Sequence, residues 1–150
     1  MPSPLELLNL TQIQQVLNRP AFRAHQVAAQ TPPAATYTLV AFDTVDVDNA
    51  SGFNAATHEY TVPLSGLYSF ESFIAFTGSS VFHSVLTLYV NGAEACRMSD
   101  EQTQFGIAGS AILQLAAGAV LGIYVYLYVS SALDTGSALC WWGGHMVSQA

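Results

Sequence analysis

Residues 123–129 read IYVYLYV, a run in which aliphatic side chains alternate with tyrosines. This alternation is typical of a β-strand, because successive side chains of a strand point to opposite faces. The aliphatic residues fit the core of a sandwich, and Tyr124, Tyr126 and Tyr128 then share the other face. Three aromatic side chains in a row form an apolar stripe that a single chain seldom leaves in water, so we expect an interface along them. The alternative, that they cap the sheet against solvent or a loop, stays open.

The residues before this run contain a turn and another strand. Residues 111–129 are apolar except for Gln114, and they are about long enough to cross a bilayer. Gly118 and Gly122 interrupt the segment, however, and its second half alternates. Two strands around a short turn therefore fit better than one membrane helix.

The chain after Pro20 is predicted to contain strands and turns alone. Asn91-Gly92 follows an alternating apolar run and is a strong hairpin signal. Many short strands separated by turns indicate a sandwich or jelly roll, so we expect one all-β domain over residues 20–150. The expected strands cover residues 21–27, 38–47, 60–64, 68–76, 86–90, 105–115, 120–129 and 138–147.

The first 33 residues are expected to form a helix and an extended arm that leads into the first strand. Ser3, Pro4 and Glu6 occupy the N-cap, first-turn and capping-box positions of a helix from residue 4 to about residue 17. A lone helix of this length is marginal in water, so it should dock on other copies of the chain, on the jelly roll or on a larger assembly. The anchor residues, spaced at about one helical turn, are Leu7, Leu10, Ile13 (or Gln14) and Leu17.

The composition points to an oligomer with protein or neutral partners. Charged residues make up 9% of the 150 residues against the usual quarter, and hydrophobic residues make up 51%. The net charge is −7, with three basic residues, so we expect neither nucleic acid nor an anionic membrane as a partner. No secretory signal is recognisable at the N-terminus. Proteins and glycans remain as partners.

Five motifs, in order along the chain, resemble the complement C1q and tumour necrosis factor superfamily. Residues 61–70, TVPLSGLYSF, are similar to its turn into a central strand, and residues 49–57 to the loop before that turn. Val90-Asn91-Gly92 is similar to its hairpin, residues 108–118 to its leucine-rich turn, and Trp142-Gly143-Gly144 to its last strand. The match runs from about Pro20 to the C-terminus, and no collagen-like repeat precedes it.

This resemblance implies a ten-stranded jelly roll, three copies about one axis, and binding rather than catalysis. It also implies that the strand over residues 123–129 lines the three-fold axis. Trp141 and Trp142 point to opposite faces of the last strand, so one belongs to the core and the other is free for a partner. The residues expected at the trimer interface are Tyr124, Tyr126, Tyr128 and Trp142.

The polar clusters predict no catalytic, metal or cofactor site. Asp43, Asp46 and Asp48 form the one acidic cluster, but no spacing matches a calcium loop, and solvated edge carboxylates explain them better. The four histidines are scattered, and no nucleophile sits in a recognisable elbow. The cysteines, Cys96 and Cys140, are either a disulfide or two small buried residues.

Two functions fit these expectations. The first is a virion surface protein made in the host cytoplasm, such as a phage capsid decoration protein or fibre head, attached to a capsid or tail by its N-terminal segment. The second is a secreted, extracellular complement-like ligand or adhesion module that binds a receptor or glycan. Both are non-enzymatic homotrimers without a cofactor.

Overall fold

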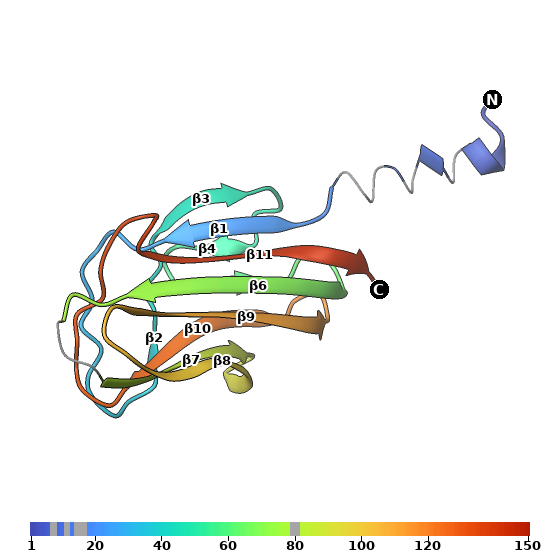
Figure 1. The fold of residues 1–150 in the computed structure, drawn as a ribbon. Coiled ribbons are helices and arrows are strands. Elements are labelled where there is room, and N and C mark those ends of the chain that lie inside the picture. Colours follow the sequence, from blue (N-terminus) through green and yellow to red (C-terminus); the bar gives the residue numbers. More distant parts are fainter. Residues whose placement is uncertain (7–8, 11–12, 14–17, 79–81) are drawn as a thin grey trace.

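The computed structural model describes residues 1–6, 9–10, 13, 18–78 and 82–150, and within them two antiparallel sheets pack face to face (Figure 1). The five-stranded sheet has the order β3-β1-β11-β6-β9. The six-stranded sheet has the order β4-β5-β10-β7-β8, and β2 pairs with β10 beside it. The predicted all-β jelly roll is thereby confirmed. The strands are Ala21–His25 (β1), Thr38–Leu39 (β2), Thr44–Asp48 (β3), Phe53–Asn54 (β4), Glu59–Thr61 (β5), Gly66–Ala75 (β6), Phe82–Val90 (β7), Ala93–Thr103 (β8), Gly106–Leu115 (β9), Val120–Leu127 (β10) and Cys140–Gln149 (β11).

The described residues form eleven strands, one more than the resemblance implied. Residues 38–47, predicted as one strand, are two strands in different sheets. The first, β2, pairs with β10, whereas β3 pairs with β1. Between them the chain crosses the sandwich, with Val40 and Phe42 fully buried in its core. The apolar side chains of this crossing made a continuous strand look plausible.

Aromatic rings fill the core between the sheets. Trp142 of β11 lies at their centre, with its ring centroid 4.9 Å from Phe22 and 6.0 Å from Phe42 and Phe53. Phe22 in turn stacks on Tyr60 at 4.0 Å, which links β1 to β5 of the other sheet. Rings of this size bury the most apolar area per residue and dominate the hydrophobic stabilisation of a core.

The turns follow the sequence signals. Asn91 and Gly92 both have positive φ values, 52° and 79°, as the tight hairpin between β7 and β8 requires. Gly118, with φ of 86°, closes the turn between β9 and β10. The apolar segment 111–129 is thus a strand pair, and no helix among the described residues is long and apolar enough to span a membrane.

The described residues near the N-terminus, 1–6, 9–10 and 13, lie away from the sandwich (Figure 1). The predicted capping box is confirmed, because Ser3 N donates to Glu6 Oε2 at 2.6 Å and Glu6 N donates to Ser3 Oγ at 3.3 Å. Residues 4–6, 9–10 and 13 are helical. Hydrogen bonds to the sandwich begin at Arg19, whose Nη1 donates to the carbonyl of Val147 at 2.7 Å.

Candidate functional site

The three tyrosines of the alternating run lie on the outer face of the six-stranded sheet. The aliphatic residues between them point inward, and Val125 and Leu127 have no exposed surface. Tyr124 and Tyr126 are half-buried, while Tyr128, one residue beyond β10, is 55% exposed. Val129 is exposed rather than buried because the strand has ended.

Two further tyrosines join them in a group that we call the tyrosine cluster: Tyr37, Tyr89, Tyr124, Tyr126 and Tyr128. Tyr89 of β7 stacks on Tyr124 with centroids 4.1 Å apart. Tyr37 lies 4.9 Å from Tyr126 and 6.1 Å from Tyr89, and it comes from the segment before β2. The row is therefore partly covered by its own chain, which gives support to the alternative that the tyrosines cap the sheet.

Charged side chains of β8 border the tyrosine cluster. Arg97 donates one hydrogen bond to the Tyr37 hydroxyl, at 3.2 Å, and another to Asp100 Oδ2, at 3.0 Å. Its Nε atom lies 3.4 Å from Glu94 Oε1. Asp100 is also hydrogen-bonded to His83, whose ring stacks on Tyr128 at 4.6 Å. The result is a surface of connected rings and charges.

These contacts shift the pKa values of two acidic groups, Asp100 and the Tyr89 hydroxyl. The hydrogen bond with His83, and after it the contacts with Arg97, lower the pKa of Asp100. Burial raises the pKa of the Tyr89 hydroxyl, and the nearby Glu94 carboxylate raises it further. The Tyr89 hydroxyl consequently stays protonated as a hydrogen-bond donor, and Asp100 stays ionised as an acceptor near neutral pH.

The prediction that Trp142 faces a partner chain is wrong. Trp142 is fully buried within a single chain, at the centre of the core, so its ring has no surface to offer a second copy. The neighbouring Trp141 faces outward and is half-buried, and the guanidinium of Arg23 lies 5.0 Å from its ring centroid. The alternation located one inward and one outward tryptophan correctly, but the choice between them was inverted.

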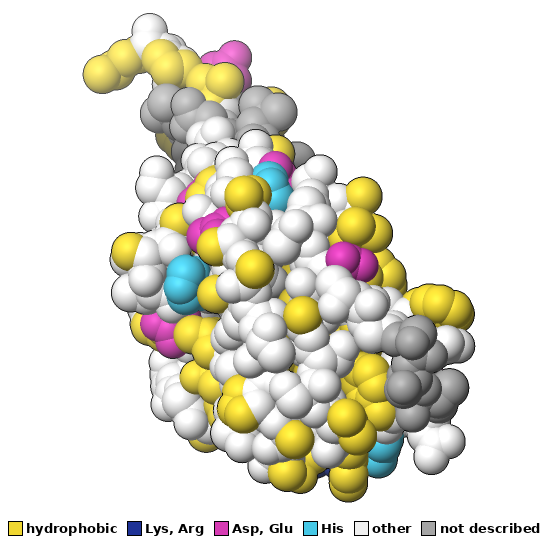
Figure 2. All heavy atoms as spheres, turned by 90° about the vertical axis from the view of Figure 1, so that its left-hand side faces the viewer, with side chains coloured by type: hydrophobic (Ala, Val, Ile, Leu, Met, Phe, Trp, Pro, Cys, Tyr) yellow, Lys and Arg dark blue, Asp and Glu magenta, His cyan; other side chains and the backbone are white. Residues whose placement is uncertain are grey.

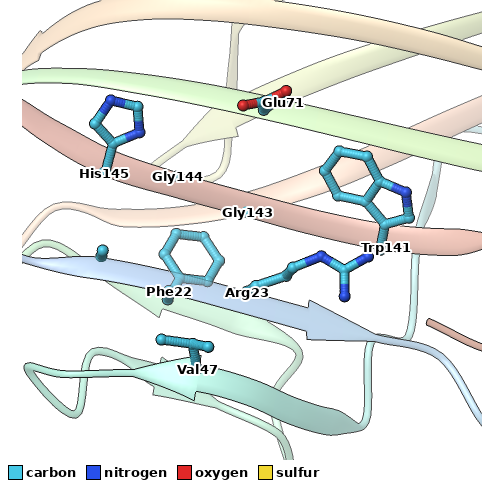
Figure 3. A pocket seen from close by; sticks show the side chains of 9 residues that line it. Phe22, Arg23, Val47, Glu71, Trp141, Gly143, Gly144 and His145 are labelled. Carbon is cyan, nitrogen blue, oxygen red and sulfur yellow. The ribbon is translucent and has the colours of Figure 1, made fainter. Parts of the chain in front are cut away.

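The outer face of the five-stranded sheet contains a shallow hollow of about 390 Å³ (Figure 3). Its floor is Gly143, which lies opposite Arg23 on one neighbouring strand and Glu71 on the other. Trp141 and His145, two positions away on the same strand, stand at its ends. The hollow exists because the central strand has no side chain at this position.

Exposed aliphatic residues are spread over this sheet, one beside the hollow and others farther from it. Val47 on β3 is 55% exposed, Ile112 on β9 is 65% exposed, and Val147 on β11 is 38% exposed. Figure 2 looks onto one end of the sandwich, where hydrophobic side chains lie scattered among polar atoms and few charged groups. The exposed aliphatic side chains of the sheet face favour a covered over a solvated state.

The three aspartates of the acidic cluster each accept hydrogen bonds from a different part of the chain. Asp43 accepts hydrogen bonds from the backbone N–H groups of Val27 and Ala28, at 2.9 and 2.8 Å. Asp46 accepts one from Arg23 Nη1, at 2.7 Å, and Asp48 accepts one from the backbone of Phe53, at 2.8 Å. Among the described residues no three acidic, histidine or cysteine side chains lie close enough together to hold a metal ion.

The cysteines are free thiols on different strands. Cys140 is buried in the core, and its Sγ donates to Gln26 Oε1 at 3.1 Å. Burial raises the pKa of this thiol to about 12, so it is not a ready nucleophile. Cys96 is partly exposed on β8.

The anchor residues are described in part. Leu10 and Ile13 are 55% and 52% exposed, and Leu5 beside them is 73% exposed. Leu7 and Leu17 lie outside the described residues. The helix therefore leaves apolar side chains without cover from its own sandwich, and the anchor role stays a prediction.

Sequence reasoning missed the partners of the tyrosines. Tyr37 and Arg97 lie 60 positions apart, and no local pattern links them. The sequence could have placed Tyr89 on the outer face, because it precedes the recognised hairpin and must face away from Leu88. The hollow at Gly143 had a weaker signal, a pair of glycines inside a strand, which often marks a close approach of another group.

Comparisons with known proteins agree on the fold. The model of the C1q domain family matches residues 21–147. Comparison with curated proteins gave no match. The globular domain of the zebrafish complement 1qA protein is 17% identical, with a TM-score of 0.60, over 87% of this chain and 99% of that one. Murine APRIL is 12% identical, with a TM-score of 0.64, over 86% and 99% of the two chains. Eiger TNF from S. frugiperda is 15% identical, with a TM-score of 0.59, over 89% and 95%.

Proposed function

The chain belongs to the C1q domain family, and on this premise we propose that it is a non-enzymatic module that assembles as a homotrimer and binds a protein partner. Domains of this family are generally binding modules rather than enzymes. The similar structures are complement and tumour-necrosis-factor-type proteins. The receptor-binding, extracellular alternative is thus better supported than attachment to a virion, which stays an untested prediction.

One observation supports the trimer contact on the five-stranded sheet, namely its exposed aliphatic residues, from Val47 beside the hollow to Ile112 at the far edge. A closed ring of three copies needs two different, complementary patches on each copy. Ile112 projects from β9 at one edge of this sheet, and the hollow lies toward the other edge, beside β1 and β3. We place Ile112 of one copy against the hollowed face of the next.

The tyrosine row is the competing location for the contact. It was predicted as the seam because three rings appeared to face water. In the structure Tyr124 and Tyr126 instead pack against Tyr89 and Tyr37 of the same chain, so they need a second copy less than Ile112 and Val47 do. We therefore assign the tyrosine cluster to the outside of the trimer.

Matched charge substitutions on the two sheets test this assignment. We expect Ile112→Asp to give a folded monomer near the chain mass of 16.0 kDa, because three carboxylates would be buried in an apolar contact. We expect Tyr126→Asp to stay a trimer, at about three times that mass. Light scattering measures both, and circular dichroism checks that each variant is folded. A trimeric Ile112→Asp protein together with a monomeric Tyr126→Asp protein would show that the trimer contact lies on the tyrosine row and not on the five-stranded sheet.

A further inference from the structure

We infer that the tyrosine cluster and its acidic border form a binding surface for a basic protein segment, one that presents arginine or lysine side chains. This inference rests on the proposed function in one respect: with the five-stranded sheet inside the trimer, the outer face of the six-stranded sheet is the face left to a partner.

The aromatic part of the surface is suited to recognition rather than to packing. Its rings are only half-buried or exposed, and among the five tyrosines only Tyr37 has a hydroxyl in a hydrogen bond within the described structure. Tyrosine supplies a large contact area at low entropic cost, and its hydroxyl remains available to a partner. Because the rings hold one another at centroid distances of 4.1 to 6.1 Å, the surface is ordered before a partner arrives.

The charges around the rings select a cationic partner. Glu94 and Asp100 lie along β8, and Glu59 of β5 lies beside Gly122 on the other side of β10, with its Cγ 3.8 Å from where a Cβ of Gly122 would be. The three carboxylates on this face, two of them paired with Arg97, outnumber its one guanidinium. Electron-rich ring faces attract cations, and the surplus of carboxylates adds to that attraction.

A buried polar group beneath the rings also lacks a partner. Thr87 of β7 pairs in register with Tyr124 on one side and Arg97 on the other. It is fully buried, and its hydroxyl forms no hydrogen bond within the described residues. A hydroxyl buried without a partner costs about 1–3 kcal/mol. Its position under the rings is independent of the acidic border, and a bound segment that shifts the neighbouring rings can supply the missing donor or acceptor.

Two other occupants fit this surface less well. A second copy of the chain has only three arginines, and Arg23 and Arg97 are already engaged with carboxylates, so self-association offers little positive charge. Nucleic acid is repelled by the same carboxylates. A neutral glycan would stack on the rings but would leave the carboxylates unmatched. A basic protein segment satisfies both the rings and the charge.

The probe is a fluorescein-labelled peptide of alternating arginine and glycine, titrated with the full-length protein and followed by fluorescence anisotropy. We expect saturable binding, and no binding of the corresponding glutamate–glycine peptide. Tyr126→Leu leaves the net charge unchanged and should weaken binding by about fivefold or more, because it removes a ring face. Glu94→Gln should weaken it as well.

A matched control distinguishes binding of the arginine peptide at the tyrosine cluster from its general attraction to an acidic protein. Glu6→Gln removes the same charge far from the tyrosine cluster, in a capping position that glutamine also fills, and should bind the peptide like the unmodified protein. If Tyr126→Leu binds as tightly as the unmodified protein, or Glu6→Gln weakens binding as much as Glu94→Gln does, the inference is overturned. Preferential binding of a neutral oligosaccharide over the arginine peptide would also overturn it.

Light scattering of the same samples separates this inference from the proposed function. A trimer that does not bind the arginine peptide contradicts the binding surface and leaves the trimer standing. A monomer that binds the peptide in a Tyr126-dependent way contradicts the trimer and leaves the binding surface standing.

Discussion

Adjacent residues of β11 have opposite environments, because successive side chains of a strand point to opposite faces. Trp142 is packed on every side by rings of the core, whereas Trp141 lies outside under the guanidinium of Arg23. Gly143 then returns to the outer face and leaves the hollow. The same three residues thus supply the centre of the core, a surface ring and the floor of the proposed trimer contact.

At this scale we predict that the two tryptophans differ sharply in their effect on stability. Trp142→Ala removes a fully buried ring and should lower the free energy of unfolding by about 3–5 kcal/mol. With both variants made in the monomeric Ile112→Asp protein, so that no second copy covers the five-stranded sheet, Trp141→Ala loses a half-buried ring and one cation–π contact and should lower it by about 1 kcal/mol. Urea denaturation of both variants at one protein concentration measures the difference. Equal losses would mean that Trp141, too, belongs to a packed interior.

Much at the residue scale could be predicted from the sequence, and its failures have a common cause. Period-two alternation placed the inward side chains of β10 correctly, and Asn91-Gly92 located a hairpin, because both depend on local geometry. Alternation says only that two faces exist, so it could not decide which tryptophan enters the core. It could not find Tyr37 either, since that contact depends on how distant segments meet.

At the scale of elements, the decisive connection is the crossing from β2 to β3. It carries the chain from one sheet to the other, and apolar side chains alone did not distinguish it from a strand. Asp43 marks its end: the backbone N–H of Asp43 donates to the carbonyl of His25 at 3.1 Å, and its carboxylate accepts from the backbone of Val27 and Ala28. The end of β1 is thereby tied to the start of β3.

We predict that the stabilisation from the Asp43 carboxylate depends on pH in the acid range. Burial acts to raise the pKa of Asp43, but the hydrogen bonds from Ala28, Val27 and Thr44 outweigh it and lower the pKa below its ordinary value of 3.8. A lowered pKa in the folded state means that the ionised carboxylate stabilises the fold above pH 3.8 and ceases to do so as the pH falls through the lowered value. Asp43→Asn should therefore cost about 1 kcal/mol at neutral pH.

The same substitution should cost progressively less as the pH falls from 3.8 through the lowered pKa of the folded state, below which the carboxyl is protonated in both states. Denaturation of the unmodified and Asp43→Asn proteins at several pH values measures the gap. If the difference in the free energy of unfolding between the two proteins stays constant down to the lowest pH, the ionised carboxylate does not stabilise the fold.

At the scale of the whole molecule, a surface with few charges is divided between two different faces. The five-stranded sheet presents aliphatic residues and a hollow, and the six-stranded sheet presents rings bordered by carboxylates. A C1q-type trimer that buries the first and exposes the second accounts for the low charge content without leaving a large apolar surface in water. The described residues near the N-terminus stand apart from both faces (Figure 1).

We predict that the sandwich is stable without the N-terminal helix. The sandwich holds the chain through Arg19 and Pro20: the Asn49 side chain donates to the carbonyl of Arg19 at 2.9 Å, and the backbone N–H of Met146 donates to the carbonyl of Pro20 at 2.8 Å. A variant lacking residues 2–18 keeps these hydrogen bonds. We expect its free energy of unfolding to change by no more than about 0.5 kcal/mol, with the oligomeric state unchanged in light scattering.

A second deletion, of residues 2–20, supplies the matched comparison, because it removes the same helix and also Arg19 with its hydrogen bonds and the buried ring of Pro20. It should lower the free energy of unfolding by about 1 kcal/mol relative to the shorter deletion, since the Asn49 side chain and the Val147 carbonyl lose Arg19 as a partner. If instead the shorter deletion already unfolds the protein or dissociates the trimer, the helix with Leu10 and Ile13 packs among the copies and is part of their core. If it does neither, those apolar side chains are free to anchor the module to another protein, and a pull-down from the native source with both forms identifies what they hold.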